Sequence, residues 1–88
     1  MVQQCEEVTY VLLCSEDIYY VGKTTQLHNR LSNHFNGNGS VVTKAYPPIK
    51  VVGVYAGNVE KEKVLYGRNK YGDDKCFGHS FHLNHKKA

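Results

Sequence analysis

A chain of 88 residues allows one small domain, and its 41% of apolar residues are enough for a single core. No apolar run approaches the roughly 20 residues that span a bilayer, and the polar segment 1–7 does not resemble a secretory signal. The net charge of +3 permits a polyanionic partner without requiring one, and three cysteines suggest no disulfide framework. We therefore expect one intracellular domain over residues 1–88, in the cytoplasm or nucleus, without membrane association.

Two short strands open the chain. The segment Val8–Cys14 (VTYVLLC) is almost continuously apolar, which is typical of a strand covered on both faces. Residues 15–17 (SED) favour a turn, and residues 18–22 (IYYVG) form a second strand. A three-residue connection predicts that the two strands pair as an antiparallel hairpin.

An amphipathic helix follows the hairpin. Leu27, Leu31 and Phe35 recur every four residues, and the sequence NGNG at residues 36–39 ends the helix. Residues 40–48 contain two adjacent prolines and are expected to form a loop.

The remaining elements complete an α+β fold. Residues 49–56 (IKVVGVYA) predict a third strand, and residues 59–71 a second helix. The order β-β-α-β-α predicts a small three-stranded antiparallel sheet flanked by helices. We expect its core to span residues 8–81, with residues 82–88 as a flexible tail.

The hairpin brings two phenols together. Its register pairs Leu12 with Tyr20 and Tyr10 with Gly22, so Tyr10 and Tyr20 lie on one face as diagonal neighbours. Since Gly22 has no side chain, the space opposite Tyr10 is expected to stay open for a ligand or a helix.

The first helix adds a guanidinium and an imidazole. Arg30 and His34 are four residues apart and flank the apolar stripe, so both lie at the seam between helix and sheet. This combination suits phosphodiester hydrolysis. A guanidinium binds phosphate oxygens, and a tyrosine or histidine can take a proton from water. A divalent ion could assist, and Mg²⁺ often needs only one or two carboxylates.

These residues resemble the motifs of the GIY-YIG nuclease family. Residues 8–10 (VTY) and 20–22 (YVG) resemble the GIY…YIG pair, and Arg30 with His34 in LHNRLSNHF resembles the helix motif. Residues 22–52 are similar to a single-domain branch that includes proteins of large DNA viruses. In that branch a G-x-G-S-x-x-T-K loop is common.

The resemblance implies a metal-dependent DNA endonuclease with one active site and Mg²⁺ or Mn²⁺ as cofactor. It makes Tyr10 the general base, and Tyr20 the side chain that orients the water or a phosphate oxygen. Arg30 would hold the scissile phosphate, and His34 would be a second phosphate or proton contact. Lys23 would ease the deprotonation of Tyr10.

The resemblance leaves the metal-binding acid open. Alignment on the single-domain branch places it at Glu60, with Glu62 as the second choice. Alignment on the family's repair enzymes places it near Gly67, which could not bind a metal. We prefer Glu60. If the acid is lost, the chain is instead a catalytically impaired nucleic-acid-binding module of the same fold.

No acidic residue lies between Asp17 and Glu60. This segment contains the four cations that we expect to contact DNA, namely Lys23, Arg30, Lys44 and Lys50. A surface this small predicts a structure-selective or nearly non-specific protein. It would act as a monomer or weak homodimer, with a targeting protein partner as a further option.

Overall fold

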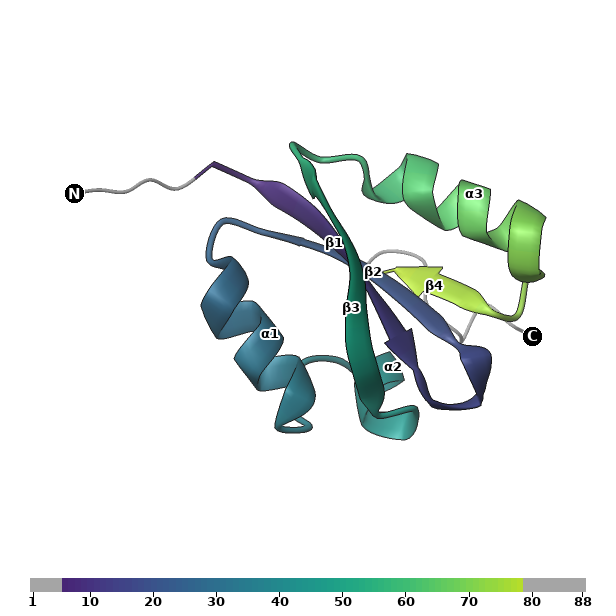
Figure 1. The fold of residues 1–88 in the computed structure, drawn as a ribbon, viewed down its shortest axis with the longest axis horizontal. Coiled ribbons are helices and arrows are strands. Elements are labelled where there is room, and N and C mark those ends of the chain that lie inside the picture. The colour runs from purple at the N-terminus through teal and green to yellow at the C-terminus, as the bar shows by residue number, and fades with distance from the viewer. Residues whose placement is uncertain (1–5, 79–88) are drawn as a thin grey trace.

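The computed structural model describes residues 6–78. Within this range a four-stranded sheet has the order β3-β1-β2-β4 (Figure 1). Strand β1 is antiparallel to β2 and β3, whereas β2 and β4 are parallel. The elements in chain order are β1 (Val8–Cys14), a 3-10 turn (Ser15–Asp17), β2 (Tyr19–Thr24), α1 (Leu27–Phe35), α2 (Val41–Ala45), β3 (Pro48–Ala56), α3 (Glu60–Tyr71) and β4 (Cys76–Gly78). The fold is mixed α+β.

Two elements differ from the prediction. The sheet is not a three-stranded antiparallel one, because β4 pairs in parallel with β2. The predicted loop at 40–48 contains α2, so the described order is β-β-α-α-β-α-β. Neither element is long enough to show a hydrophobic periodicity in the sequence, since β4 has three residues and α2 has five. The expected tail at 82–88 lies outside the described residues.

The hairpin has the predicted register. Leu12 pairs with Tyr20, and Tyr10 pairs with Gly22. The connecting turn is tight because Glu16 and Asp17 both have a φ of 61°. This register puts alternate residues of β1 and β2 on the same face of the sheet.

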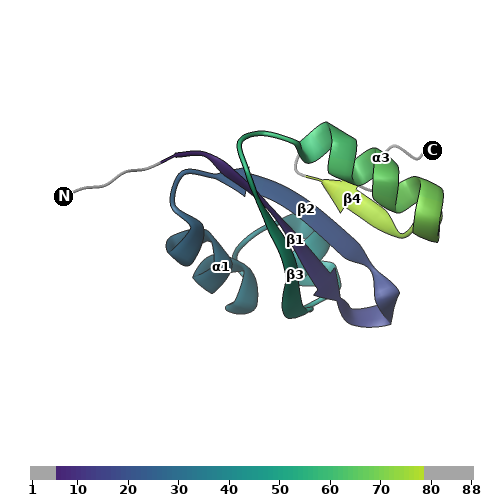
Figure 2. The same ribbon diagram turned by 45° about the horizontal axis from the view of Figure 1, so that its top comes forward.

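Helices cover both faces of the sheet. Helices α1 and α2 lie on one face and α3 on the other, as two views show (Figures 1 and 2). The α1 face has the larger buried cluster, made of Tyr10, Leu12, Cys14, Ile18, Tyr20, Val42 and Phe77. The α3 face has a smaller cluster of Val21, Val64 and Cys76. Among residues 6–78, no helix has the length and apolar character needed to cross a membrane.

Candidate active site

A cavity of about 370 Å³ opens where β1 begins and β2 ends. Four residues predicted from the sequence line it: Tyr10, Tyr20, Lys23 and Arg30. They come from β1, β2 and α1. The hairpin and the packing of α1 therefore gather two phenols and two cations around one cavity.

The two phenols are buried side by side. Tyr10 is 0% exposed and Tyr20 is 1% exposed, and their ring centroids are 6.4 Å apart. The Tyr10 phenol lies over Gly22 and fills the place of its missing side chain, and both residues line the open cavity. A Cβ on Gly22 would overlap that phenol. Glycine at this position is thus a condition for the placement of Tyr10.

His34 supports Tyr10 from α1. Its Nε2 lies 2.6 Å from the Tyr10 hydroxyl, and its side chain is fully buried. His34 follows Leu27 and Leu31 at helical spacing on the side of α1 that packs on the core, whereas Phe35 is 46% exposed. Burial, and then the charge of Arg30, lower the pKa of His34 to about 4. The imidazole is therefore neutral at pH 7 and has a nitrogen that can accept a proton.

The surroundings of the phenols keep both protonated. Burial, and then Tyr20, raise the pKa of Tyr10 to about 12, although the hydrogen bond and charge of Arg30 act in the opposite direction. Burial also raises the pKa of Tyr20. The Tyr20 hydroxyl makes no hydrogen bond with any residue from 6 to 78. A buried, unpartnered hydroxyl at a cavity can donate to a bound oxygen.

Glu60 is the first residue of α3 and is not part of the cavity lining. Its side chain is 4% exposed, and its Oε1 lies 3.6 Å from Lys23 Nζ. A Cβ on Gly78 would overlap Glu60 Oε2, so β4 passes close behind the carboxylate. The charge of Glu60 raises the pKa of both phenols. The carboxylate is thus close enough to act on the cavity electrostatically.

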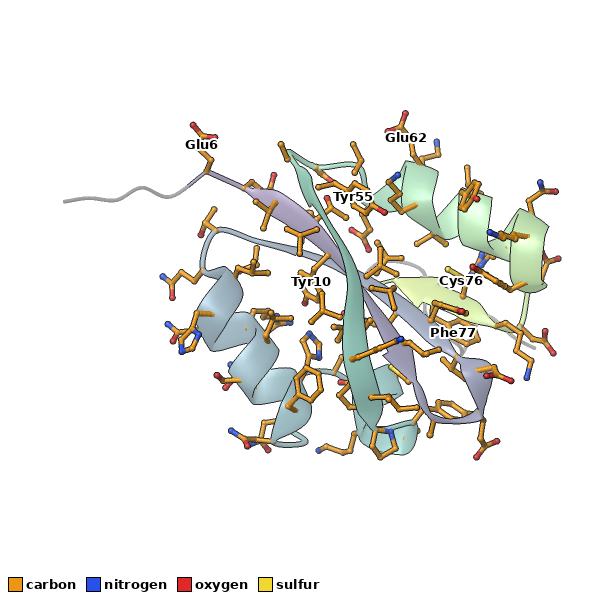
Figure 3. All side chains as sticks on the ribbon, viewed as in Figure 1. Glu6, Tyr10, Tyr55, Glu62, Cys76 and Phe77 are labelled. Atoms are coloured by element: carbon orange, nitrogen blue, oxygen red, sulfur yellow. The ribbon has the colours of Figure 1, made fainter. Side chains whose placement is uncertain are left out.

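The alternative acid positions are less suitable. Glu62 is exposed and projects outward from α3, away from Tyr10 (Figure 3). Gly67 is buried, and a Cβ there would overlap Cys76 Sγ, so a larger side chain has no room. Among the described residues, no three His, Cys, Asp or Glu side chains form a group that could hold a metal ion. A metal at this site would therefore have at most two protein carboxylates, with water and substrate oxygens as its other ligands.

The predicted DNA-contacting cations divide into two groups. Lys23 and Arg30 line the cavity. Lys44 on α2 and Lys50 on β3 are exposed and are not part of its lining. Lys50 pairs with Leu13, near the end of β1 that is distant from the cavity.

The sequence-based prediction missed four residues at this site. Glu7, Thr24 and Thr25 line the cavity at the ends of the two strands. Thr43 Oγ1 lies 2.9 Å from His34 Nδ1. Of these residues only Thr43 had a sequence signal, since it belongs to the G-x-G-S-x-x-T-K loop.

Residues 6–71 match the model of the GIY-YIG catalytic domain. The chain belongs to the GIY-YIG family. The matched range contains the hairpin with both phenols, α1 with Arg30 and His34, and α3 with Glu60. Membership supports a nuclease type of chemistry, since the family is one of nucleases that generally depend on divalent metals.

This GIY-YIG domain is similar to bacterial proteins. It is 40% identical to the UPF0213 protein spr1390 of Streptococcus pneumoniae over 57 residues, which are 64% of this chain and 56% of that protein. It is 43% identical to the UPF0213 protein YsiG of Lactococcus lactis over 44 residues, which are 50% of this chain and 42% of that protein. The chain thus matches about half the length of these curated relatives. They lend no support to the predicted likeness to proteins of large DNA viruses. No solved structure was found that matches the chain.

Proposed function

We propose that this GIY-YIG domain is a metal-dependent DNA endonuclease that hydrolyses phosphodiester bonds at one site. The observation that carries the proposal is the buried hydrogen bond of 2.6 Å between Tyr10 and His34, at a cavity that Arg30 and Lys23 also line. His34 can accept a proton through Tyr10, and the two cations can bind a phosphate. This arrangement suits the attack of water on a phosphodiester. The substrate would be intracellular DNA.

Tyr10 would pass a proton on rather than act as a free phenolate. With a pKa of about 12, only about one Tyr10 in 10⁵ is ionised at pH 7. As the water oxygen bonds to phosphorus, the water proton moves to Tyr10 Oη and the Tyr10 proton moves to His34 Nε2. The bond from phosphorus to the leaving oxygen breaks, and that oxygen takes a proton from solvent.

The other cavity residues would bind the phosphate. Arg30 offers a fixed fork of donors that matches two phosphate oxygens and remains charged at any working pH. The unpartnered hydroxyl of Tyr20 would donate to a phosphate oxygen or orient the attacking water. These donors act in a partly buried place, where each interaction is stronger than in bulk water.

Glu60 is the carboxylate that we expect to hold Mg²⁺ or Mn²⁺, with Glu62 as the second choice. The donor set fits such an ion, because Mg²⁺ commonly binds through one or two carboxylates while water and phosphate fill its other positions. When bound, the ion would stabilise negative charge on the phosphate and acidify a coordinated water. The nearby ammonium of Lys23 indicates that a positive charge is already favoured beside this carboxylate.

Binding to DNA would extend beyond the cavity. Exposed Lys44 and Lys50 would add contacts to the phosphate backbone that carry no sequence information. We expect a structure-selective or nearly non-specific substrate, with the protein acting as a monomer or weak homodimer or through a targeting partner.

Nicking of supercoiled plasmid in Mg²⁺ or Mn²⁺ tests the proposal. We expect Arg30→Ala to lower the nicking rate by about 10²-fold or more, as expected when a transition-state donor is removed. Lys61→Ala is the matched control, since Lys61 is an exposed cation on α3 outside the cavity. Equal background nicking by the wild type and Arg30→Ala would contradict the proposal.

A second pair of variants tests the metal ligand. Glu60→Gln should abolish metal-dependent nicking, whereas Glu62→Gln on the same helix should cut like the wild type. If Glu62→Gln alone loses activity, the second-choice acid is the ligand.

One observation favours the alternative of a catalytically impaired binding module: Glu60 is already paired with Lys23 and is not in the cavity lining. This alternative predicts DNA binding that weakens steeply with salt and is unaffected by EDTA, without cleavage. A metal-dependent cut that is lost in Glu60→Gln would exclude it.

A further inference from the structure

The histidine behind Tyr10 has a second buried partner. Thr43 is 1% exposed, and its Oγ1 lies 2.9 Å from His34 Nδ1. The Ser40 hydroxyl lies 3.1 Å from Thr43 Oγ1 and accepts a hydrogen bond of 3.1 Å from Thr43 N, so it also caps α2. Both nitrogens of His34 therefore have partners, one on β1 and one on α2.

The loop before α2 is shaped around the imidazole. A Cβ on Gly39 would overlap the His34 ring. Gly39, Ser40 and Thr43 are three of the small residues of the G-x-G-S-x-x-T-K loop, and the proposed phosphate chemistry gives none of the three a role. Their common feature is contact with His34 or with the side chain that binds it.

The donors and acceptors of this network can be arranged in one direction. Arg30 lines the same cavity as Tyr10 and its guanidinium can only donate, so it offers the Tyr10 proton no acceptor. The Tyr10 proton is then directed to His34 Nε2. A neutral imidazole has a single N–H, which must be on Nδ1 and donate to Thr43 Oγ1. The Thr43 hydroxyl in turn points to the Ser40 carbonyl at 3.5 Å.

We propose that Thr43 is a positioning residue: its hydroxyl holds His34 in the tautomer with the proton on Nδ1, so that Nε2 stays open to the Tyr10 proton. The catalytic consequence rests on the proposed nuclease function, whereas the tautomer itself does not. The opposite tautomer would place an N–H against the Tyr10 hydroxyl, and the proton could not leave Tyr10 along this path.

The tautomer can be read directly from the ¹⁵N chemical shifts of the histidine rings without DNA or metal. A variant His34→Gln identifies the His34 signals by their loss. We expect the wild type to show an Nδ1–H, Nε2-acceptor imidazole. Thr43→Val, which keeps the side-chain shape but removes the hydroxyl, should show the Nε2–H tautomer or a mixture. Thr43→Ser, which keeps the hydroxyl, should restore the wild-type pattern.

The same variants are then assayed on plasmid. Thr43→Val should cut at least about tenfold more slowly, since positioned proton transfer contributes about 10²–10⁴-fold, while Thr43→Ser retains most of the rate. A wild-type His34 with its proton on Nε2, or a Thr43→Val spectrum identical to that of the wild type, would overturn the inference. If Thr43→Val does not fold, the wild-type and Thr43→Ser spectra still decide the tautomer. They do so even if the wild type cuts no DNA, an outcome that would refute only the proposed nuclease.

Discussion

Tyr10→Phe separates the structural role of the phenol from its chemical role. The substitution keeps the ring over Gly22 and removes only the hydroxyl. Because His34 is fully buried, its Nε2 would lose the 2.6 Å partner and have no protein partner in its place. An unsatisfied buried polar atom costs about 1–3 kcal/mol of unfolding free energy.

This cost translates into a measurable melting temperature. For a domain of this size, a loss of 1 kcal/mol lowers the Tm by about 4–8 °C, so a loss of about 1–3 kcal/mol should make Tyr10→Phe melt roughly 4–24 °C below the wild type. Tyr55→Phe is the matched control. Tyr55 is 39% exposed, and its ring contact with Lys63 Nζ at 3.8 Å survives the change. Its stability should stay within about 0.5 kcal/mol of the wild type.

The rate of plasmid nicking is measured at a temperature at which all three proteins are folded. Tyr10→Phe should cut about 10²–10⁴-fold more slowly, because the water proton loses its path to His34, and Tyr55→Phe should cut normally. Nicking by Tyr10→Phe at the wild-type rate would refute the proton path. A Tm equal to that of the wild type would refute the buried hydrogen bond.

Three further predictions follow from the same contacts. Gly22→Ala should lose about 1–3 kcal/mol of unfolding free energy in urea, because the added methyl meets the Tyr10 phenol; a variant as stable as the wild type would contradict that placement. The pKa of His34 is about 4 when folded and 6.5 ordinarily, so its contribution to stability is complete above pH 6.5 and falls as pH drops from 6.5 toward 4. Urea titrations across this pH range should show a shallower decline in His34→Gln, and an equal decline would argue against a buried neutral imidazole. Gly67→Ala should destabilise α3 despite a helix-propensity gain of about 1 kcal/mol, since the methyl would overlap Cys76 Sγ; a raised Tm would show that Cys76 moves aside without cost.

Several parts of the site could be predicted because they depend on local pattern. The three-residue connection determines the hairpin register, and the register puts Tyr10 and Tyr20 on one face. The spacing of Arg30 and His34 placed both near the helix–sheet seam. The structure refines this, since His34 rather than Phe35 takes the buried position after Leu31.

Other features had no local signal. Strand β4 is too short to show the alternating pattern of a strand in the sequence. It forms by pairing with β2 at the edge of the sheet. Helix α2 depends on the Ser40 cap. The preference for Glu60 over Glu62 came from alignment, but the contact of Glu60 with Lys23 and its closeness to Gly78 depend on how α3 packs.

Period, turn length and residue type by themselves determined the central hairpin, the first helix and the set of side chains that meet there, because these depend on neighbours within a few residues. Only the tertiary structure decided which of those groups are buried together. The hydrogen bonds from Tyr10 to His34 and from His34 to Thr43 join β1, α1 and α2. The burial that lowers the pKa of His34 and raises that of Tyr10 arises only when these elements pack and exclude water.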